Sequence, residues 1–201
     1  MTSTNPASTA DRLLVAIVCG STRPGRRSAR VATWPAELAA DHDAVSCEVV
    51  DLADQDLPMF DEAIPPLAGA YEGEHTQRWA ATIARFDAFV FVTPEYNHSA
   101  PAALKNALDF LFAEWNDKAA GFVSYGVDGG VRAVEHLRGV MGEIKLADVR
   151  SQISLSLTED WRDYLDPATF APRDEHREAV AGLLDDLAAW GGALRTLRSA
   201  A

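Results

Sequence analysis

The sequence predicts an α/β fold, in which a parallel sheet of five strands lies between two layers of helices. Along the 201 residues, five apolar segments alternate with five segments of helical periodicity, which is the pattern of consecutive β-α-β units. The segments 13–19, 88–92 and 119–123 are almost continuously apolar, as expected for strands buried on both faces. A chain that is 48% hydrophobic can bury one sizeable core. We therefore expect one domain over residues 11–201.

Two further strands alternate polar with apolar residues, which is typical of strands at the edge of a sheet. They are 45–49, Val-Ser-Cys-Glu-Val, and 153–157, Ile-Ser-Leu-Ser-Leu. Counted along the chain, these are strands 2 and 5. Edge positions for both are consistent with the strand order 2-1-3-4-5 of the flavodoxin-like fold. The predicted architecture is therefore a flavodoxin-like three-layer sandwich with helices on both faces.

Four helices are placed by apolar stripes and by signals at their ends. The first runs from Ser28 to about residue 40 and contains Pro35, which predicts a kink or an early stop. Another lies within 99–112, with Ser99 as N-cap and Pro101 in its first turn. The apolar stripes that support the helices are Leu104, Ala107, Leu108 and Leu111 in this segment, Val131, Val134, Leu137 and Met141 in a fourth helix, and Val180, Leu183, Leu184, Leu187 and Leu194 in a final helix from about Asp174.

Two long connections remain, residues 52–73 and 156–173. Loops of this length in a compact domain are usually functional or cover an interface. Their aromatic residues Phe60, Trp161 and Tyr164 have two interpretations: packing within their own chain, or covering the site of a second copy. The first ten residues are polar and uncharged, and we expect them to form a disordered tail.

The charge of the chain excludes some partners and favours others. A net charge of −12 would repel nucleic acid over most of the surface, so no nucleic-acid partner is expected. Arg23, Arg26, Arg27 and Arg30 form a basic island within this acidic chain. Such an island suits a single phosphate group, although any one of these arginines is also typical of a solvated helix start.

Cysteine and histidine usage argues against disulfides and metals. Cys19 and Cys47 both fall inside predicted strands and are interpreted as reduced core thiols of a cytoplasmic protein. The apolar segment 13–19 is far too short to span a membrane, so no membrane partner is expected. The histidines show no metal-ligand spacing and predict no metal site; they are His42, His75, His98, His136 and His176.

The loop that follows the first strand, residues 20–28, has the composition of an anion cradle. Ser21, Thr22 and Ser28 supply hydroxyl groups and Arg23 a guanidinium, while the next helix offers its N-terminal N–H groups. The loop is neither a Walker A motif nor a Gly-x-Gly-x-x-Gly fingerprint. From its residues alone, phosphate binding and an ordinary capped loop are about equally favoured.

The loops after the third and fourth strands offer sites for a flat ring. In residues 94–97, Pro-Glu-Tyr-Asn, the backbone amides and the asparagine side chain can form hydrogen bonds with the edge of a heteroaromatic ring. In residues 124–130, three glycines allow a planar ligand to approach the main chain beside Tyr125. All three loops follow carboxyl ends of parallel strands, which is where ligands bind in open α/β sheets. Together they predict a phosphorylated aromatic cofactor.

These motifs resemble the NADPH-dependent FMN reductase family. The similar stretches are 20–28 (Gly-Ser-Thr-Arg-Pro-Gly-Arg-Arg-Ser), 94–110 (from Pro-Glu-Tyr-Asn to Lys-Asn-Ala-Leu-Asp-Phe) and 124–126 (Ser-Tyr-Gly), with 51–60 similar to the Leu-Pro loop of the family. The resemblance implies a flavodoxin-like fold and an activity like that of quinone, azo-dye or chromate reductases. It spans roughly residues 13–141.

The resemblance also implies which residues bind FMN. The implied phosphate ligands are Ser21, Arg23 and Ser28; the residues bordering the isoalloxazine are Pro94, Glu95, Tyr96 and Asn97; those closing its other side are Ser124, Tyr125, Gly126 and Gly129. Lys105, Asn106 and Asp109 belong to the motif but are interpreted as capping or dimer contacts. His98 stands where the family commonly has glycine.

The predicted function is an FMN-dependent NAD(P)H oxidoreductase, a homodimer or dimer of dimers. It would pass two electrons from NADPH or NADH through FMN to a quinone or similar small-molecule acceptor by a ping-pong mechanism. No side chain is assigned as a catalytic acid or base, because the cofactor carries the chemistry. The alternatives are a flavodoxin-like electron carrier, a flavin reductase that supplies reduced FMN to a monooxygenase, and a non-enzymatic binding module.

Overall fold

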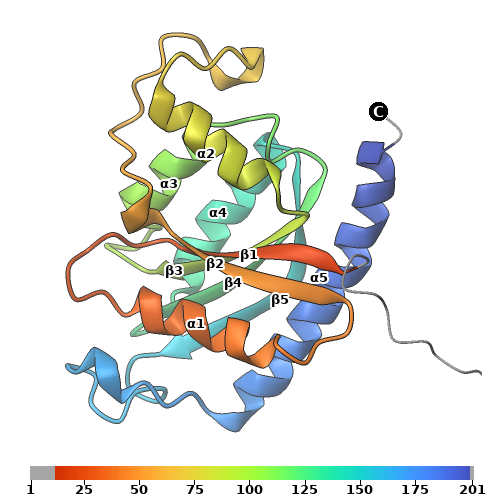
Figure 1. Cartoon of the computed structure of the whole chain (residues 1–201). Coiled ribbons are helices and arrows are strands. Elements are labelled where there is room, and N and C mark those ends of the chain that lie inside the picture. Colours follow the sequence, from red (N-terminus) through yellow and green to blue (C-terminus); the bar gives the residue numbers. More distant parts are fainter. Residues whose placement is uncertain (1–11, 200–201) are drawn as a thin grey trace, which may run out of the picture.

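The computed structural model of the protein describes residues 12–199 and shows a five-stranded parallel sheet (Figure 1). The strand order is β2-β1-β3-β4-β5, which confirms the predicted order and its edge strands. The strands are β1 (Leu13–Cys19), β2 (Val45–Asp51), β3 (Ala88–Pro94), β4 (Lys118–Gly126) and β5 (Leu146–Ser156). The predicted disordered tail, residues 1–10, lies outside the described residues.

Within the described residues, five α-helices form the two outer layers on either side of the sheet (Figure 1). They are α1 (Ser28–Leu38), α2 (Glu74–Ala84), α3 (Ala102–Asp109), α4 (Val131–Glu143) and α5 (Asp174–Ser199), with short 3-10 helices η1 (Leu52–Asp54), η2 (Pro66–Ala68) and η3 (Pro167–Thr169). Helices α1 and α5 cover one face of the sheet, and α2, α3 and α4 cover the other. Each face has its own cluster of buried side chains, so the central strands are apolar on both sides.

The predicted N-cap at Ser99 is wrong. Helix α3 begins at Ala102 with Pro101 in the N-cap position, where the fixed φ of proline suits a helix entry. Ser99 instead closes a tight turn with Tyr96 through two backbone hydrogen bonds. Its hydroxyl lies 2.9 Å from Nδ1 of His136. A long-range contact has therefore replaced the local cap.

Helix α1 has nearly the extent predicted for the first helix, and α4 carries the predicted apolar stripe with one exception. Helix α1 contains Pro35 and ends three residues later, at Leu38. In α4 the buried positions include Val134, Leu137 and Met141 as predicted, whereas Val131 is 37% exposed. Among residues 12–199, no helix is both long and apolar enough to cross a membrane.

Lys118, at the start of β4, is a buried lysine with a pH-dependent effect on stability. It is 5% exposed, and its Nζ donates to the carbonyls of Ile83 and Ala84 at the end of α2. Burial, reinforced by the positive charge of Arg198, lowers its pKa from 10.5 to about 8. Between these two values the unfolded chain binds the proton and the folded chain does not, so stability rises with pH.

We therefore expect the wild type to gain stability relative to Lys118→Met as the pH is raised from 8 to 10, by roughly 1 to 3 kcal/mol. The free energy of unfolding of both proteins is measured by urea titration at each pH. Groups that titrate equally in both proteins cancel in the difference. Parallel pH profiles would contradict the prediction.

Candidate functional site

Three loops meet at the carboxyl edge of the sheet, after β1, β3 and β4. The N–H of Gly20 donates to the carbonyl of Val92 (2.9 Å), which fastens the first loop to β3. The N–H of Glu95 donates to the carbonyl of Tyr125 (3.0 Å), which fastens β3 to β4. A Cβ at Gly20 would lie 2.7 Å from the Val92 oxygen, so this close approach requires glycine.

A cleft of about 220 Å³ opens between these loops. Its lining residues are Arg23, Arg26, Arg27, Pro94, Glu95, Tyr96, Tyr125, Gly126 and Leu157. The predicted site residues brought together there are Arg23, Pro94, Glu95, Tyr96, Tyr125 and Gly126. The predicted residues outside this lining are Ser21, Ser28, Asn97, Ser124 and Gly129. The ligand role of each of these residues stays a prediction.

The first loop is tied to the second by side chains. The Ser21 hydroxyl lies 2.8 Å from the Tyr96 hydroxyl, and the Arg23 guanidinium lies 5.9 Å from the centre of the Tyr96 ring. Ser28 is the first residue of α1, and its hydroxyl donates a long hydrogen bond (3.4 Å) to the Ser21 carbonyl. Both serines are buried, whereas Arg23 is exposed. The predicted phosphate ligands therefore lie close together at the start of α1.

The second loop is a tight left-handed turn. Asn97 and His98 both have positive φ, 48° and 72°, between the mutually hydrogen-bonded Tyr96 and Ser99. This is the conformation of a type I′ turn, which asparagine followed by glycine adopts most easily. Asn97 is exposed beside the cleft. The backbone conformation explains why glycine suits position 98.

We expect His98→Gly to stabilise the protein by about 0.5 to 1 kcal/mol, because a side chain at positive φ costs more than the extra flexibility of glycine in the unfolded chain. Thermal unfolding and urea titration measure the change. His98→Ala is the matched control: it removes the imidazole but keeps a Cβ at positive φ, so it should give no gain. Equal stabilisation by both substitutions would contradict the backbone explanation.

The third loop, residues 126–130, is fixed by a hydrogen bond from a buried serine. The buried Ser124 hydroxyl donates to the Gly129 carbonyl (2.7 Å), so this serine braces the loop. Gly129 and Gly130 both have a φ of 73°. A Cβ at Gly130 would lie 2.8 and 2.9 Å from the backbone nitrogen and oxygen of Tyr125. Gly130, absent from the predicted site residues, therefore sets the path of the chain beside the cleft.

Tyr125 is more deeply buried than a side chain that only lines the wall of a pocket. Its side chain packs on the α1 and α5 face of the sheet, only 5% exposed, with its ring centre 6.0 Å from that of Trp161. Burial raises the pKa of its hydroxyl far above the ordinary value. The residue thus forms part of the floor of the cleft, and the remaining aromatic at the rim is Tyr96.

Glu95 is oriented by an arginine that the sequence analysis did not single out. Arg132, in the first turn of α4, donates from Nε to Oε1 of Glu95 (2.6 Å) and also pairs with Asp128 (2.7 Å). The Glu95 side chain is 9% exposed. This ion pair fastens the β3 loop to the loop after β4. No local pattern identifies such a pair, because its members lie 37 residues apart.

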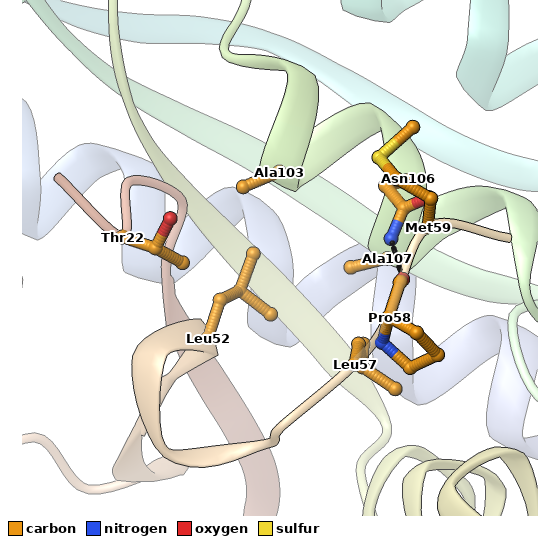
Figure 2. Close-up of a pocket in the computed structure, with 8 residues that line it drawn as sticks. All are labelled: Thr22, Leu52, Leu57, Pro58, Met59, Ala103, Asn106 and Ala107. Carbon is orange, nitrogen blue, oxygen red and sulfur yellow. Dashed lines mark hydrogen bonds between the residues drawn. The ribbon is translucent and has the colours of Figure 1, made fainter.

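Asn106 has a different role from the predicted cap or dimer contact. From α3, its Oδ1 accepts from the Phe60 N–H (2.8 Å) and its Nδ2 donates to the Pro58 carbonyl (2.7 Å), as Figure 2 shows for the second bond. The side chain therefore fixes the 57–60 segment. A second pocket of about 280 Å³ lies between this segment, α3 and Thr22 (Figure 2).

The 156–173 loop passes beside the start of α1 (Figure 1). Arg27 donates to the carbonyl of Tyr164, and its guanidinium lies 5.7 Å from the Trp161 ring centre. Trp161 is 4% exposed and also contacts Phe170, at 4.9 Å between ring centres. For Trp161, packing within its own chain is confirmed. Tyr164 is 55% exposed.

The sequence model of the NADPH-dependent FMN reductase family matches residues 13–160. The chain belongs to this family. The family resemblance drawn from the three loops is thereby confirmed, and so are the oxidoreductase class and its cofactors, FMN and NAD(P)H. The match ends before the aromatic part of the 156–173 loop. Within residues 12–199, no cluster of three or more His, Cys, Asp or Glu side chains has the arrangement of a metal site.

Several known reductases are similar to the chain over about two thirds of its length or more. An NAD(P)H-dependent FMN reductase of Schizosaccharomyces pombe is 41% identical over 148 residues, which cover 73% of this chain and 74% of the relative. An NAD(P)H-dependent FMN reductase of Saccharomyces cerevisiae is 35% identical, and the match covers 66% of this chain and 75% of the relative. A quinone reductase of Escherichia coli is 33% identical, and the match covers 65% of this chain and 70% of the relative.

Solved structures agree on the fold. A flavoenzyme NAD(P)H:(acceptor) oxidoreductase from Paracoccus denitrificans superposes with a TM-score of 0.70, at 22% identity, over 90% of this chain and 98% of the other. At this level of identity the likeness establishes the flavodoxin-like fold alone.

Proposed function

We propose that this FMN reductase family member passes two electrons from NAD(P)H to a quinone or similar small acceptor, with FMN bound in the cleft. The balanced reaction is NAD(P)H + H⁺ + quinone → NAD(P)⁺ + hydroquinone. The observation that carries the proposal is the meeting of the three family loops at one cleft. A ping-pong order, in which NAD(P)⁺ leaves before the acceptor binds, follows if one open face of the cofactor serves both reactants.

The residues of the cleft fit a phosphorylated ring. The hydroxyls of Ser21 and Ser28 and the guanidinium of Arg23 lie at the start of α1, where helix N–H groups attract an anion. At the β4 side of the cleft, the 126–130 loop turns back on β4. Only glycine fits at position 130, because any Cβ there would clash with the Tyr125 backbone. A polar, cationic end next to a glycine-lined end matches a ligand with a phosphate at one end and a flat ring at the other.

In the proposed mechanism the protein binds and orients, and the flavin supplies the redox chemistry when bound. Ser21, Arg23 and Ser28 would hold the phosphate. The ring would lie between the segments 94–97 and 124–129. Arg132 keeps the Glu95 carboxylate turned toward α4. The N–H groups of Glu95 and Tyr96 donate within the protein, so this segment would meet the ring edge through Asn97. No side chain of the cleft is assigned a proton-transfer role.

The decisive experiment is an absorption spectrum of the purified protein with FMN, followed by NADPH and then NADH without oxygen. We expect bound flavin, bleaching by a pyridine nucleotide, and recovery of the oxidised spectrum when a quinone is added. A protein that neither binds FMN nor oxidises NAD(P)H would overturn the proposal. Accumulation of a stable one-electron reduced flavin would instead identify an electron carrier. Loss of FMN on dialysis, together with kinetics that saturate with added flavin, would identify a reductase that supplies reduced flavin.

We further propose a homodimer or dimer of dimers. Four apolar side chains of the 52–73 segment are exposed: Met59 (75%), Phe60 (41%), Ile64 (38%) and Leu67 (72%). Met59 also lines the second pocket. Several large exposed apolar side chains in one segment suit an interface. Light scattering should give at least twice the mass of the chain, and a monomeric mass would remove the proposal. The free thiols Cys19 and Cys47 are consistent with the proposed cytoplasmic location.

A further inference from the structure

Within residues 12–199, four buried polar atoms of residues that line the cleft have no hydrogen-bond partner: the Tyr125 hydroxyl, Nε of Arg26, Nε of Arg27 and Oε2 of Glu95. The Glu95 carboxylate is already paired with Arg132 through its other oxygen. Unpaired buried polar atoms are uncommon in proteins. The other three groups can each donate a hydrogen bond, and two of them are cationic. The shared complement of these three donors is an anionic acceptor.

The three donors lie around the first turn of α1. Arg26 and Arg27 immediately precede that helix, which begins at Ser28. The Ser28 hydroxyl lies near the Tyr125 hydroxyl, and the positive charge of Arg27 opposes the rise in the Tyr125 pKa that burial causes. Backbone N–H groups at the N-terminus of α1 add further donors pointing to the same place. The Arg26 guanidinium already pairs with Asp51 through Nη2, which leaves its Nε for a ligand.

The 156–173 loop holds two of the donors. The Trp161 ring is in contact with the ring of Tyr125 on one side and lies under the Arg27 guanidinium on another. The Tyr164 carbonyl accepts from the same guanidinium, which leaves Nε of Arg27 unpaired. Trp161 and Tyr164 lie beyond residues 13–160, which the family model matches. This support therefore comes from a part of the chain that the family motifs do not describe.

We propose that the Tyr125 hydroxyl, with Arg26 and Arg27, donates to the phosphate monoester of the bound ligand, and that Trp161 is a positioning residue for Tyr125 and Arg27. The inference rests on the proposed function, because it takes FMN as the ligand. It adds donors to the predicted phosphate set of Ser21, Arg23 and Ser28. It also gives the 156–173 loop a role in selecting phosphorylated over unphosphorylated flavin.

The test compares FMN with riboflavin, which has the same ring and no phosphate. Dissociation constants are measured by quenching of flavin fluorescence with the full chain after removal of flavin. We expect Tyr125→Phe to weaken FMN binding about tenfold, the value of a hydrogen bond to a charged group, and riboflavin binding by less than about twofold. Without flavin, the same variant should keep or raise the Tm, because it removes an unpaired buried hydroxyl.

A second pair of variants tests the positioning role of Trp161. Trp161→Leu removes the aromatic face under Arg27 and beside Tyr125, so the preference for FMN over riboflavin should fall about tenfold. Trp161→Phe keeps an aromatic ring there and should retain most of the preference. A purely structural role would weaken both flavins equally and leave their ratio unchanged.

The outcomes separate the inference from the proposed function. If the wild type binds FMN but Tyr125→Phe leaves the FMN-to-riboflavin ratio unchanged, the inference is overturned and the proposed function stands. If the ratio falls equally in Trp161→Leu and Trp161→Phe, or in neither, the positioning role is overturned. If the wild type binds neither flavin, both the inference and the proposed function fail.

Discussion

Gly130→Ala is expected to abolish flavin binding and to lower the free energy of unfolding by about 2 kcal/mol or more. Two causes add at this position. A φ of 73° is costly for any residue with a Cβ, and that Cβ would lie within 2.9 Å of backbone atoms of Tyr125. Relief of the clash requires the 126–130 loop to move away from β4. Because this loop borders the cleft, the site is distorted together with the fold.

Gly139→Ala provides the matched control for this prediction. Gly139 lies in the middle of α4, where an added Cβ meets nothing within 4 Å. Alanine should stabilise the helix there by about 0.5 to 1 kcal/mol. Urea titration and flavin fluorescence are measured on both variants. Similar stability and flavin affinity in the two proteins would show that the cleft tolerates movement of its third loop.

The strand order was predictable because burial leaves a direct trace in the sequence. Strands covered on both faces have few positions for a polar residue, whereas edge strands have many, and this difference identified β2 and β5. Given a parallel sheet with known order, the carboxyl ends of β1, β3 and β4 must meet at one edge. The cleft therefore followed from composition and topology, without knowledge of any side-chain contact.

The internal organisation of the cleft was less predictable. Tyr125 shares a face of β4 with Val123, because residues two apart in a strand point the same way. That spacing places its ring in the core, but its aromatic character alone suits a pocket wall equally well. The Glu95 to Arg132 pair and the contacts of Trp161 join residues distant in sequence, for which local patterns carry no signal. Asn106 likewise bonds a loop almost fifty residues away.

We expect Asp160→Asn to lower the free energy of unfolding by about 2 to 3 kcal/mol and to loosen the loop that carries Trp161. The Asp160 side chain is fully buried. It accepts hydrogen bonds from the Ser156 N–H (2.8 Å), the Arg173 N–H (3.1 Å) and Nε of Arg173 (3.2 Å), and it lies 3.3 Å from His176. An amide of the same shape has one acceptor oxygen and no charge, so several of these donors lose their partner.

Limited proteolysis and urea titration measure the effect, with Asp174→Asn as control. Asp174 has a fully exposed carboxylate a short distance along the chain, so its change should leave stability within about 0.5 kcal/mol. Asp160 lies next to Trp161 and fastens both ends of the loop segment, through Ser156 on one side and Arg173 on the other. Loosening it should therefore also reduce the preference for FMN over riboflavin. Rapid cleavage of the loop with an unchanged flavin preference would mean that Trp161 keeps its place without this anchor.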